Sequence, residues 1–249
     1  MGFESIDLVG LRGLCDHVPS MSTPEELRAA GRQFRASHLR ASSINADPGS
    51  FDGYDDTDAV MSRVENLLAL ALECEVPLLV LPAGEKTEAP VADRQIGRMT
   101  AALNQAADRA REKGVRLAVE APYFGRPVDN IDLANEMLAG LDPYVELAFD
   151  VSHIEAADES VITAWELFSS RVGIVHLRDA DSRNVRRVIG AGRVDFAAFY
   201  RAMAATAYRG DIVLELETRD SPYATKEDEV LAAVAYLNEI VTEDKEVVR

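Results

Sequence analysis

The chain has 249 residues, and 47% of them are hydrophobic, which is enough apolar material for one sizeable core. Its formal net charge of −17, from 43 acidic and 26 basic side chains, would repel nucleic acid phosphates and anionic membrane surfaces. The sequence contains no apolar run of about 18 residues and no basic stretch followed by an apolar one at its start, so we expect neither a membrane span nor a secretion signal. These properties predict one cytoplasmic domain over residues 1–249 that acts on a small molecule.

Predicted strands and helices alternate through the first half of the chain. A short strand is expected at residues 2–9. Thr23, Pro24 and Glu26 then supply an N-cap, a proline in the first turn and a glutamate three residues after the cap, and so start a helix that runs to about Ala36. The other elements predicted here are a strand at 39–44, a helix that begins at Asp58 and is ended by Pro77, a strand at 78–81 and a helix at about 91–113.

The second half repeats this alternation. Strands that end at Glu120, Asp150, His176 and Glu217 alternate with helices expected at 130–141, 160–170, 196–207 and 225–241, the third of which Asp195 is placed to cap. Seven strands with continuous apolar runs, each followed by a helix, indicate a parallel sheet covered by helices on its outer side. An open doubly wound sheet would also fit, but polar residues at several strand ends that could meet at one point favour a TIM-type (β/α) barrel.

Residue types that bind metals stand at the ends of four predicted strands. An apolar run from Val145 ends at Asp150, and Glu120, His176 and Glu215 hold similar places, at successive intervals of 30, 26 and 39 residues. Each interval is about the length of one βα unit, so parallel neighbouring strands would bring the four side chains to one rim. Three carboxylates and one imidazole predict a single divalent metal ion, with Mn²⁺, Mg²⁺ or Co²⁺ favoured and Zn²⁺ and Fe²⁺ as further candidates.

Each of these residues also has an ordinary structural interpretation. A carboxylate at a strand end can cap a helix or pair with an arginine, and His176 could be a core histidine. The common spacing of all four favours the ligand interpretation. Glu215 and Glu217 compete for the last ligand position, because side chains two residues apart on a strand share a face.

With these residues placed, the chain resembles the xylose isomerase-like TIM barrels, a group of sugar phosphate isomerases and epimerases. The resemblance covers nearly the whole sequence. It rests on Gly-Phe-Glu-Ser-Ile-Asp-Leu at 2–8, Val-Glu-Ala-Pro at 119–122, Phe-Asp-Val-Ser-His at 149–153, His-Leu-Arg-Asp at 176–179, Gly-Ala-Gly at 190–192 and Tyr-Arg-Gly-Asp-Ile-Val-Leu-Glu at 208–215. It implies metal ligands at Glu120, Asp150, His176 and Glu215, with His153 facing the substrate, and it favours Glu215 over Glu217 as the last ligand.

The sequence departs from the family pattern at three places. The motif at 2–8 resembles the second strand of the family, so the first βα unit is expected to be missing, and either seven strands close the barrel or an open edge invites a homodimer. The strands that end near Asn45 and Pro82 carry no histidine where the zinc endonucleases of this superfamily have them, which disfavours endonuclease activity. Arg178 replaces the usual lysine of a His-x-Lys-Asp motif.

The expected metal chemistry is proton transfer next to a carbonyl group. A metal that polarises the carbonyl stabilises an enediolate, and two carboxylates on opposite sides of the carbon can remove and return its proton. We assign both tasks, ligand and acid/base catalyst, to Glu120 and Glu215. The predicted function is a metal-dependent isomerase or epimerase of a ketose, a sugar phosphate or a related polyhydroxy ketone. A dehydratase of a keto-cyclitol or a dehydroshikimate-like acid shares the first step and is the alternative, and a non-catalytic sugar-binding barrel is another.

An arginine-rich segment follows His176. The five guanidinium groups of this segment, within a strongly acidic chain, could clamp the phosphate or carboxylate of a sugar or keto-acid substrate. They belong to Arg178, Arg183, Arg186, Arg187 and Arg193. A solvated loop balanced by Asp179 and Asp181 explains the same charges equally well. The side chains predicted to contact substrate are His153, Arg178, Arg186, Arg187, Arg193 and Glu217.

A few other residues of reactive or special types receive no site role. Cys15 and Cys74 are too few and too far apart for a disulfide framework or a zinc–thiolate site, so both are expected to be reduced thiols, with Cys74 on a helix. His17 and His38 have no comparable context. The glycines at 190 and 192 lack the third glycine of a dinucleotide fingerprint and are interpreted as turn residues.

Overall fold

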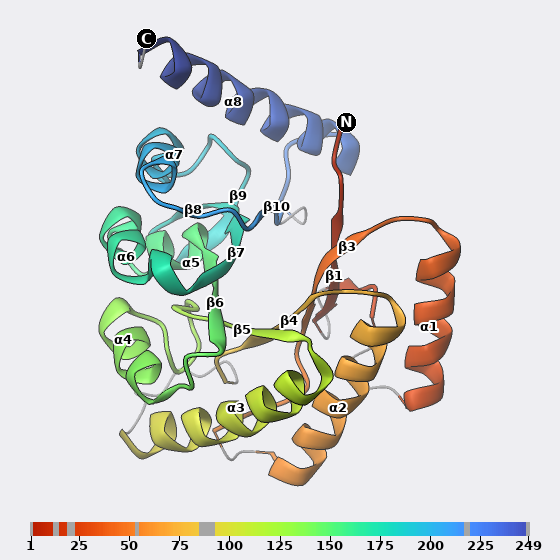
Figure 1. Cartoon of the computed structure of the whole chain (residues 1–249). Helices are drawn as coiled ribbons and strands as arrows, with labels where there is room; N and C mark the ends of the chain where they lie inside the picture. Colours follow the sequence, from red (N-terminus) through yellow and green to blue (C-terminus); the bar gives the residue numbers. More distant parts are fainter. Residues whose placement is uncertain are drawn as a thin grey trace.

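A computed structural model describes residues 2–11, 15–18, 23–52, 55–84, 93–216 and 220–247 (Figure 1). Seven parallel strands form its central sheet. They are β1 (Ile6–Leu11), β3 (Ala41–Ala46), β4 (Leu78–Pro82), β5 (Arg116–Glu120), β6 (Val145–Asp150), β7 (Val172–Leu177) and β10 (Asp211–Leu214). The short strand β2 (Cys15–Asp16) adds an antiparallel partner to β1.

The sheet curls into a nearly closed barrel. Its strand order is β10-β7-β6-β5-β4-β3-β1-β2, and within the described residues β1 and β10 do not pair with each other. The expected seven-stranded barrel of βα units is therefore confirmed, with a seam between its first and last parallel strands. A homodimer that covers this edge remains a prediction.

Helices surround the outside of the sheet (Figure 1). They are α1 (Pro24–Ala36), α2 (Thr57–Glu73), α3 (Asp93–Lys113), α4 (Ile131–Gly140), α5 (Val151–Ala156), α6 (Val161–Phe168), α7 (Phe196–Ala204) and α8 (Lys226–Val247), with a 3-10 helix at Ser169–Arg171. Among the described helices, none has a window both long and apolar enough to cross a membrane.

Local signals place the helix starts where the sequence predicts them. The capping box of α1 is complete, because the backbone N–H of Thr23 donates to Glu26 Oε2 at 2.8 Å and the Thr23 side chain accepts from the Glu26 backbone. Asn130, Ser160 and Asp195 each accept a backbone N–H at the starts of α4, α6 and α7.

His153 lies in the short helix α5, which begins directly after Asp150 and was not among the predicted helices. Three expectations about local structure need correction. The segment after His176 forms a hairpin of β8 (Asp179–Asp181) and β9 (Asn184–Arg187), because the antiparallel pairing satisfies backbone groups that a loop would leave to solvent. The last strand ends at Leu214, and Glu217 lies outside the described residues. Cys74 is the C-cap residue that follows α2.

The pleat of the strands explains why the polar residues at the strand ends face the barrel interior. A small interior cluster is built by Leu78, Val80, Ala118, Ala148 and Ile174, with Val213 packed against it. Successive side chains of a strand point to opposite faces, so the residue two positions further along shares the interior face. That next residue is Glu120 on β5, Asp150 on β6 and His176 on β7, and directly after β10 it is Glu215.

A buried carboxylate fixes the loop that follows the hairpin. Asp179 Oδ1 accepts the backbone N–H groups of Ala180 at 2.8 Å and Val194 at 3.1 Å, and Oδ2 accepts those of Gly190 and Gly192, both at 2.9 Å. Four charge-assisted bonds to one buried side chain hold this loop in one conformation. The predicted turn glycines are confirmed in this role, and Gly190 has a φ of +88°.

Replacing Gly192 by alanine should destabilise the protein by about 1–3 kcal/mol, because an added Cβ would lie 2.5 Å from the Ala180 carbonyl oxygen and closer still to Asp179 Oδ1. Urea unfolding followed by circular dichroism measures the change. Gly97→Ala in α3 is the matched control, since a Cβ there meets nothing within 4 Å. Equal unfolding midpoints for the two variants would contradict the prediction.

Candidate metal centre

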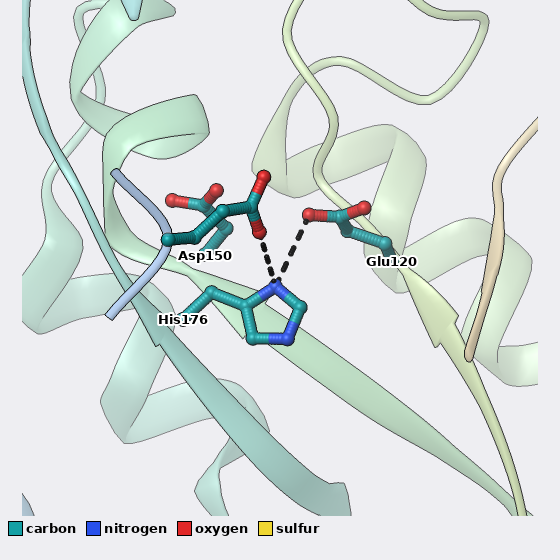
Figure 2. A group of neighbouring side chains, drawn as sticks. Glu120, Asp150 and His176 are labelled. Atoms are coloured by element: carbon teal, nitrogen blue, oxygen red, sulfur yellow. Dashed lines mark ion pairs between the residues drawn. The ribbon is translucent and has the colours of Figure 1, made fainter. Parts of the chain in front are cut away.

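The four side chains predicted as ligands meet at the carboxyl ends of the strands. Figure 2 shows three of them, Glu120, Asp150 and His176. Glu120, Asp150, His176 and Glu215 each offer one potential ligand atom, and these atoms lie within 4.8 Å of one another. In-register pairing of the parallel strands brings them together, because Asp150 stands opposite His176 and Glu120 opposite Ala148. The structure thus joins residues that are far apart in the sequence.

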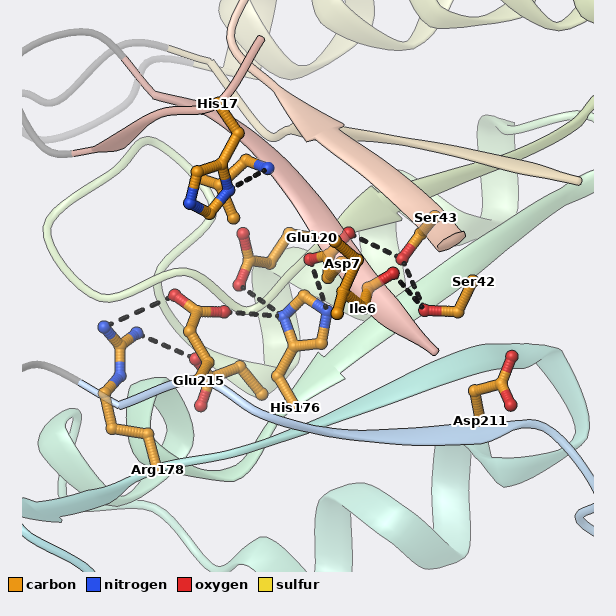
Figure 3. Close-up of polar contacts among 12 residues, drawn as sticks. Ile6, Asp7, His17, Ser42, Ser43, Glu120, His176, Arg178, Asp211 and Glu215 are labelled. Atoms are coloured by element: carbon orange, nitrogen blue, oxygen red, sulfur yellow. Dashed lines mark hydrogen bonds and ion pairs between the residues drawn. The ribbon is translucent and has the colours of Figure 1, made fainter. Parts of the chain in front are cut away.

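The arrangement of atoms fits a cation. Figure 3 shows the carboxylates of Glu120 and Glu215 facing one nitrogen of the His176 ring. His176 Nδ1 lies 2.8 Å from Glu215 Oε2 and 3.7 Å from Glu120 Oε1. All three atoms are buried without a well-formed hydrogen bond in the described part of the chain. Since buried polar atoms normally have partners, convergent lone pairs of this kind suit a divalent ion.

Burial and mutual repulsion perturb the acids of this cluster. Loss of hydration raises the pKa of Glu120 to about 7, although His176 opposes the shift. Burial also favours the neutral form of Glu215, but Arg178 and His176 hold the pKa of that carboxyl well below its usual range. For His176 the desolvation is outweighed by Glu120 and Glu215, which raise the imidazole pKa well above its ordinary value. Positive charge next to these carboxylates is therefore strongly favoured.

His153 lies beside the cluster as a neutral imidazole. Its Nε2 is 3.6 Å from Asp150 Oδ2 and 3.8 Å from Glu120 Oε1, and its ring stacks on Tyr123 with centroids 3.8 Å apart. Burial lowers the pKa of His153 to about 4, with Asp150 acting against the shift. His153 Nδ1 is buried without a hydrogen-bond partner in the described chain. Because Arg178 Nη2 can only donate, its 3.1 Å contact with His153 Nε2 leaves the proton of the neutral ring on Nδ1, which can donate to a ligand.

Arg178 is the arginine of the predicted set that reaches the cluster. Its Nη2 donates to Asp150 Oδ2 at 2.8 Å, its Nε donates to Ser152 Oγ at 3.0 Å, and its Nη1 lies 3.5 Å from Glu215 Oε1. The side chain is 5% exposed. Attraction to Asp150 and Glu215 outweighs desolvation and raises the guanidinium pKa further above its usual range. Arg178 therefore orients two of the four candidate ligands.

The other arginines predicted to contact substrate pair with acidic side chains at the surface. Arg186 lies 3.5 Å from Asp220, and Arg187 pairs with Asp181 across the hairpin. Arg193 contacts Glu155 at 2.8 Å and Asp158 at 3.1 Å. All three are about half exposed, and their contact with substrate remains a prediction. So does that of Glu217, which is outside the described residues.

Three polar or aromatic residues were not singled out as site residues from the sequence, and two of them, Asp7 and Tyr123, contact His176 and His153. Asp7 of β1 faces His176, Asn45 of β3 is buried with an unpartnered amide among the described residues, and Tyr123 stacks on His153. A polar residue inside an otherwise apolar strand was the available signal for Asp7. Tyr123 gave no such signal, because it follows β5 in an irregular segment.

Comparisons with known proteins agree with this architecture. A family model described as xylose isomerase-like TIM barrel matches residues 1–240. L-ribulose 3-epimerase of Methylomonas sp. (strain DH-1) is 30% identical over 190 residues, which cover 72% of this chain and 64% of that protein. Inosose dehydratase of Lacticaseibacillus casei is 25% identical over 165 residues, which cover 59% of this chain and 55% of that protein. The chain thus matches only part of the length of these curated relatives.

A solved structure with the same fold contains a metal. The IOLI protein with a binding zinc atom superposes with a TM-score of 0.76 at 17% identity, over 97% of this chain and 89% of that one. At this identity the likeness concerns the fold.

Proposed function

This chain belongs to the family of xylose isomerase-like TIM barrels, and on that premise we propose that it is a divalent-metal-dependent isomerase or epimerase of a ketose, a sugar phosphate or a related polyhydroxy ketone. The observation that carries the proposal is the convergence of Glu120, Asp150, His176 and Glu215 within 4.8 Å at the carboxyl ends of the strands. In barrels of this architecture the active site lies at that face. Similarity to an L-ribulose 3-epimerase and to an inosose dehydratase supports it.

The four clustered residues would hold the metal ion. When bound, such an ion polarises the substrate carbonyl and stabilises the negative charge that develops on its oxygen. Oxygen-rich ligands with one imidazole favour Mn²⁺, Mg²⁺ or Co²⁺. Zinc is a further candidate because the structural neighbour carries it, and Fe²⁺ fits the same donor set.

Two carboxylates would move the proton. Glu120 comes from β5 and Glu215 follows β10, so they approach His176 from different strands (Figure 3). One removes the proton next to the carbonyl, and the other returns it from the opposite side of the carbon. His153 and Arg178, at the edge of the cluster, would bind substrate oxygens and keep the reacting carbon in place.

Proton exchange tests this proposal. The Mn²⁺-loaded or Co²⁺-loaded protein is incubated in D₂O with a panel of ketoses, their phosphates and cyclic polyhydroxy ketones, and NMR follows the α-proton. We expect deuterium incorporation together with appearance of an isomer or epimer. Binding of a sugar without any exchange across the panel would contradict the proposal and favour a non-catalytic barrel.

A dehydratase is the second candidate, favoured by the match to inosose dehydratase. It shares the proton abstraction but then expels a β-hydroxyl group as water. Product analysis separates the two, because a dehydratase yields an unsaturated product that absorbs in the near ultraviolet, while an epimerase conserves the mass of its substrate.

Arg186→Ser combined with Arg187→Ser tests whether this hairpin binds anionic substrates. We expect KM for a phosphorylated or carboxylated substrate to rise about tenfold or more, from the loss of charge-assisted hydrogen bonds, while KM for the uncharged ketose stays the same. Steady-state kinetics on the matched pair of substrates measures the difference. Equal KM changes for both substrates, or no change for either, would assign these arginines to their surface pairs with Asp220 and Asp181.

A further inference from the structure

Asp7 and His176 meet across the inside of the barrel. Asp7 belongs to β1 and His176 to β7, strands that are not neighbours in the sheet. The Asp7 side chain is 5% exposed and the His176 side chain is fully buried, and Asp7 Oδ2 lies 3.8 Å from His176 Nε2. Both atoms lack a hydrogen-bond partner in the described chain. Buried polar atoms normally have a partner, and each of these two atoms faces the other.

The two nitrogens of His176 have different surroundings. Nδ1 faces Glu120 and Glu215, whereas Nε2 faces Asp7 on the other side of the ring (Figure 3). Asp7 is therefore separated from the group of candidate ligand atoms by the imidazole itself. This position suits a residue that orients the ring and does not suit a further ligand.

The Asp7 carboxylate is itself held in place. Ser43, its partner in the register between β1 and β3, donates from Oγ to Asp7 Oδ1 at 2.6 Å. Ser42 continues the polar chain, since its Oγ donates to the Ile6 carbonyl at 3.2 Å. With Oδ1 fixed by Ser43, Oδ2 remains directed at His176.

We propose that Asp7 is a positioning residue that holds His176 for metal binding. A histidine that binds a metal through one nitrogen usually donates its other N–H to a carboxylate, which fixes the tautomer and the ring orientation. Here Nδ1 is the nitrogen among the carboxylates, and Nε2–H is the donor available to Asp7. At 3.8 Å the contact is within ion-pair range, and it must shorten to about 3 Å to form that hydrogen bond.

This inference rests on the proposed metal site and deepens it. Losing the carboxylate that accepts the second N–H of a metal-binding histidine typically lowers metal affinity by about 10–100-fold. The effect on affinity should exceed the effect on folding, because within the described chain the Asp7 carboxylate accepts one hydrogen bond, from Ser43.

The test compares Asp7→Ala and Asp7→Asn with the wild type and with Asp211→Asn. Asp211 is exposed on β10, so its replacement removes one acidic charge without touching the cluster. Mn²⁺ affinity is measured by competition with a chelator, and thermal unfolding of the metal-free proteins is measured in parallel. These readouts are independent of turnover.

We expect Asp7→Ala to weaken Mn²⁺ binding about 10–100-fold. Asp7→Asn should fall between it and the wild type, because the amide oxygen can still accept from Nε2–H, and Asp211→Asn should bind as the wild type does. If Asp7→Ala does not fold, the nearly isosteric Asp7→Asn decides the question by its own affinity. Wild-type affinity in both Asp7 variants overturns the inference alone, whereas a wild-type protein that binds no metal overturns the proposed function and this inference with it.

Discussion

Replacing His176 by alanine, or Glu120 by glutamine, is expected to remove the metal from a protein that otherwise carries about one divalent ion per chain. Both side chains point into the same buried cluster, and His176 supplies its single imidazole. Loss of one ligand from such a set should lower the metal affinity by more than about 100-fold. Removing a group that only hydrogen-bonds to a metal ligand already costs about 10–100-fold. Elemental analysis of protein purified without chelator, and again after incubation with Mn²⁺ or Co²⁺, measures the change.

Glu146→Gln is the matched control for this experiment. Glu146 lies on β6 like Asp150, but it pairs with Arg116 toward the start of the strand. The control variant should keep the wild-type metal content. A wild-type protein that takes up no metal after incubation would contradict the metal centre and place the sugar-binding barrel first among the alternatives.

Glu215→Gln should have the second large effect, on proton transfer. A carboxylate that removes a substrate proton accelerates that step by about 10²–10⁴-fold, so exchange should slow by that factor. In a two-base mechanism each carboxylate serves one face of the carbon. The variant is therefore expected to lose deuterium exchange with one epimer of the substrate and to keep it with the other, as NMR in D₂O can follow for each epimer.

Metal content decides how that result is interpreted, because Glu215 is also a candidate ligand. Exchange is measured at saturating Mn²⁺, and elemental analysis confirms that the variant is loaded. Glu146→Gln again serves as the control and should exchange both epimers at the wild-type rate. A loaded Glu215→Gln protein that exchanges both epimers normally would remove Glu215 from the acid/base pair.

The sequence alone determined the alternation of elements and the candidate ligands. Apolar runs that end in Glu120, Asp150 and His176 predict buried strands with polar residues at their carboxyl ends. The two-residue period of a strand places Ala118 and Glu120 on one face, and likewise Ala148 and Asp150. Helix starts such as the Thr23 capping box are equally local. Signals of this kind depend on residues a few positions apart and can be read from the chain directly.

Only the tertiary structure decided which polar groups face one another. Arg178 turns inward to Asp150, whereas Arg187, from the same arginine-rich segment, pairs with Asp181 across a hairpin, and composition cannot separate the two. The contact between Asp7 and His176 depends on how the barrel curls and on a register shift between Ile6 and Asp7 on β1. A one-residue change in register sends a side chain to the opposite face of a sheet. Periodicity therefore fixed which residues reach the rim, and the register and curvature of the whole sheet fixed their partners.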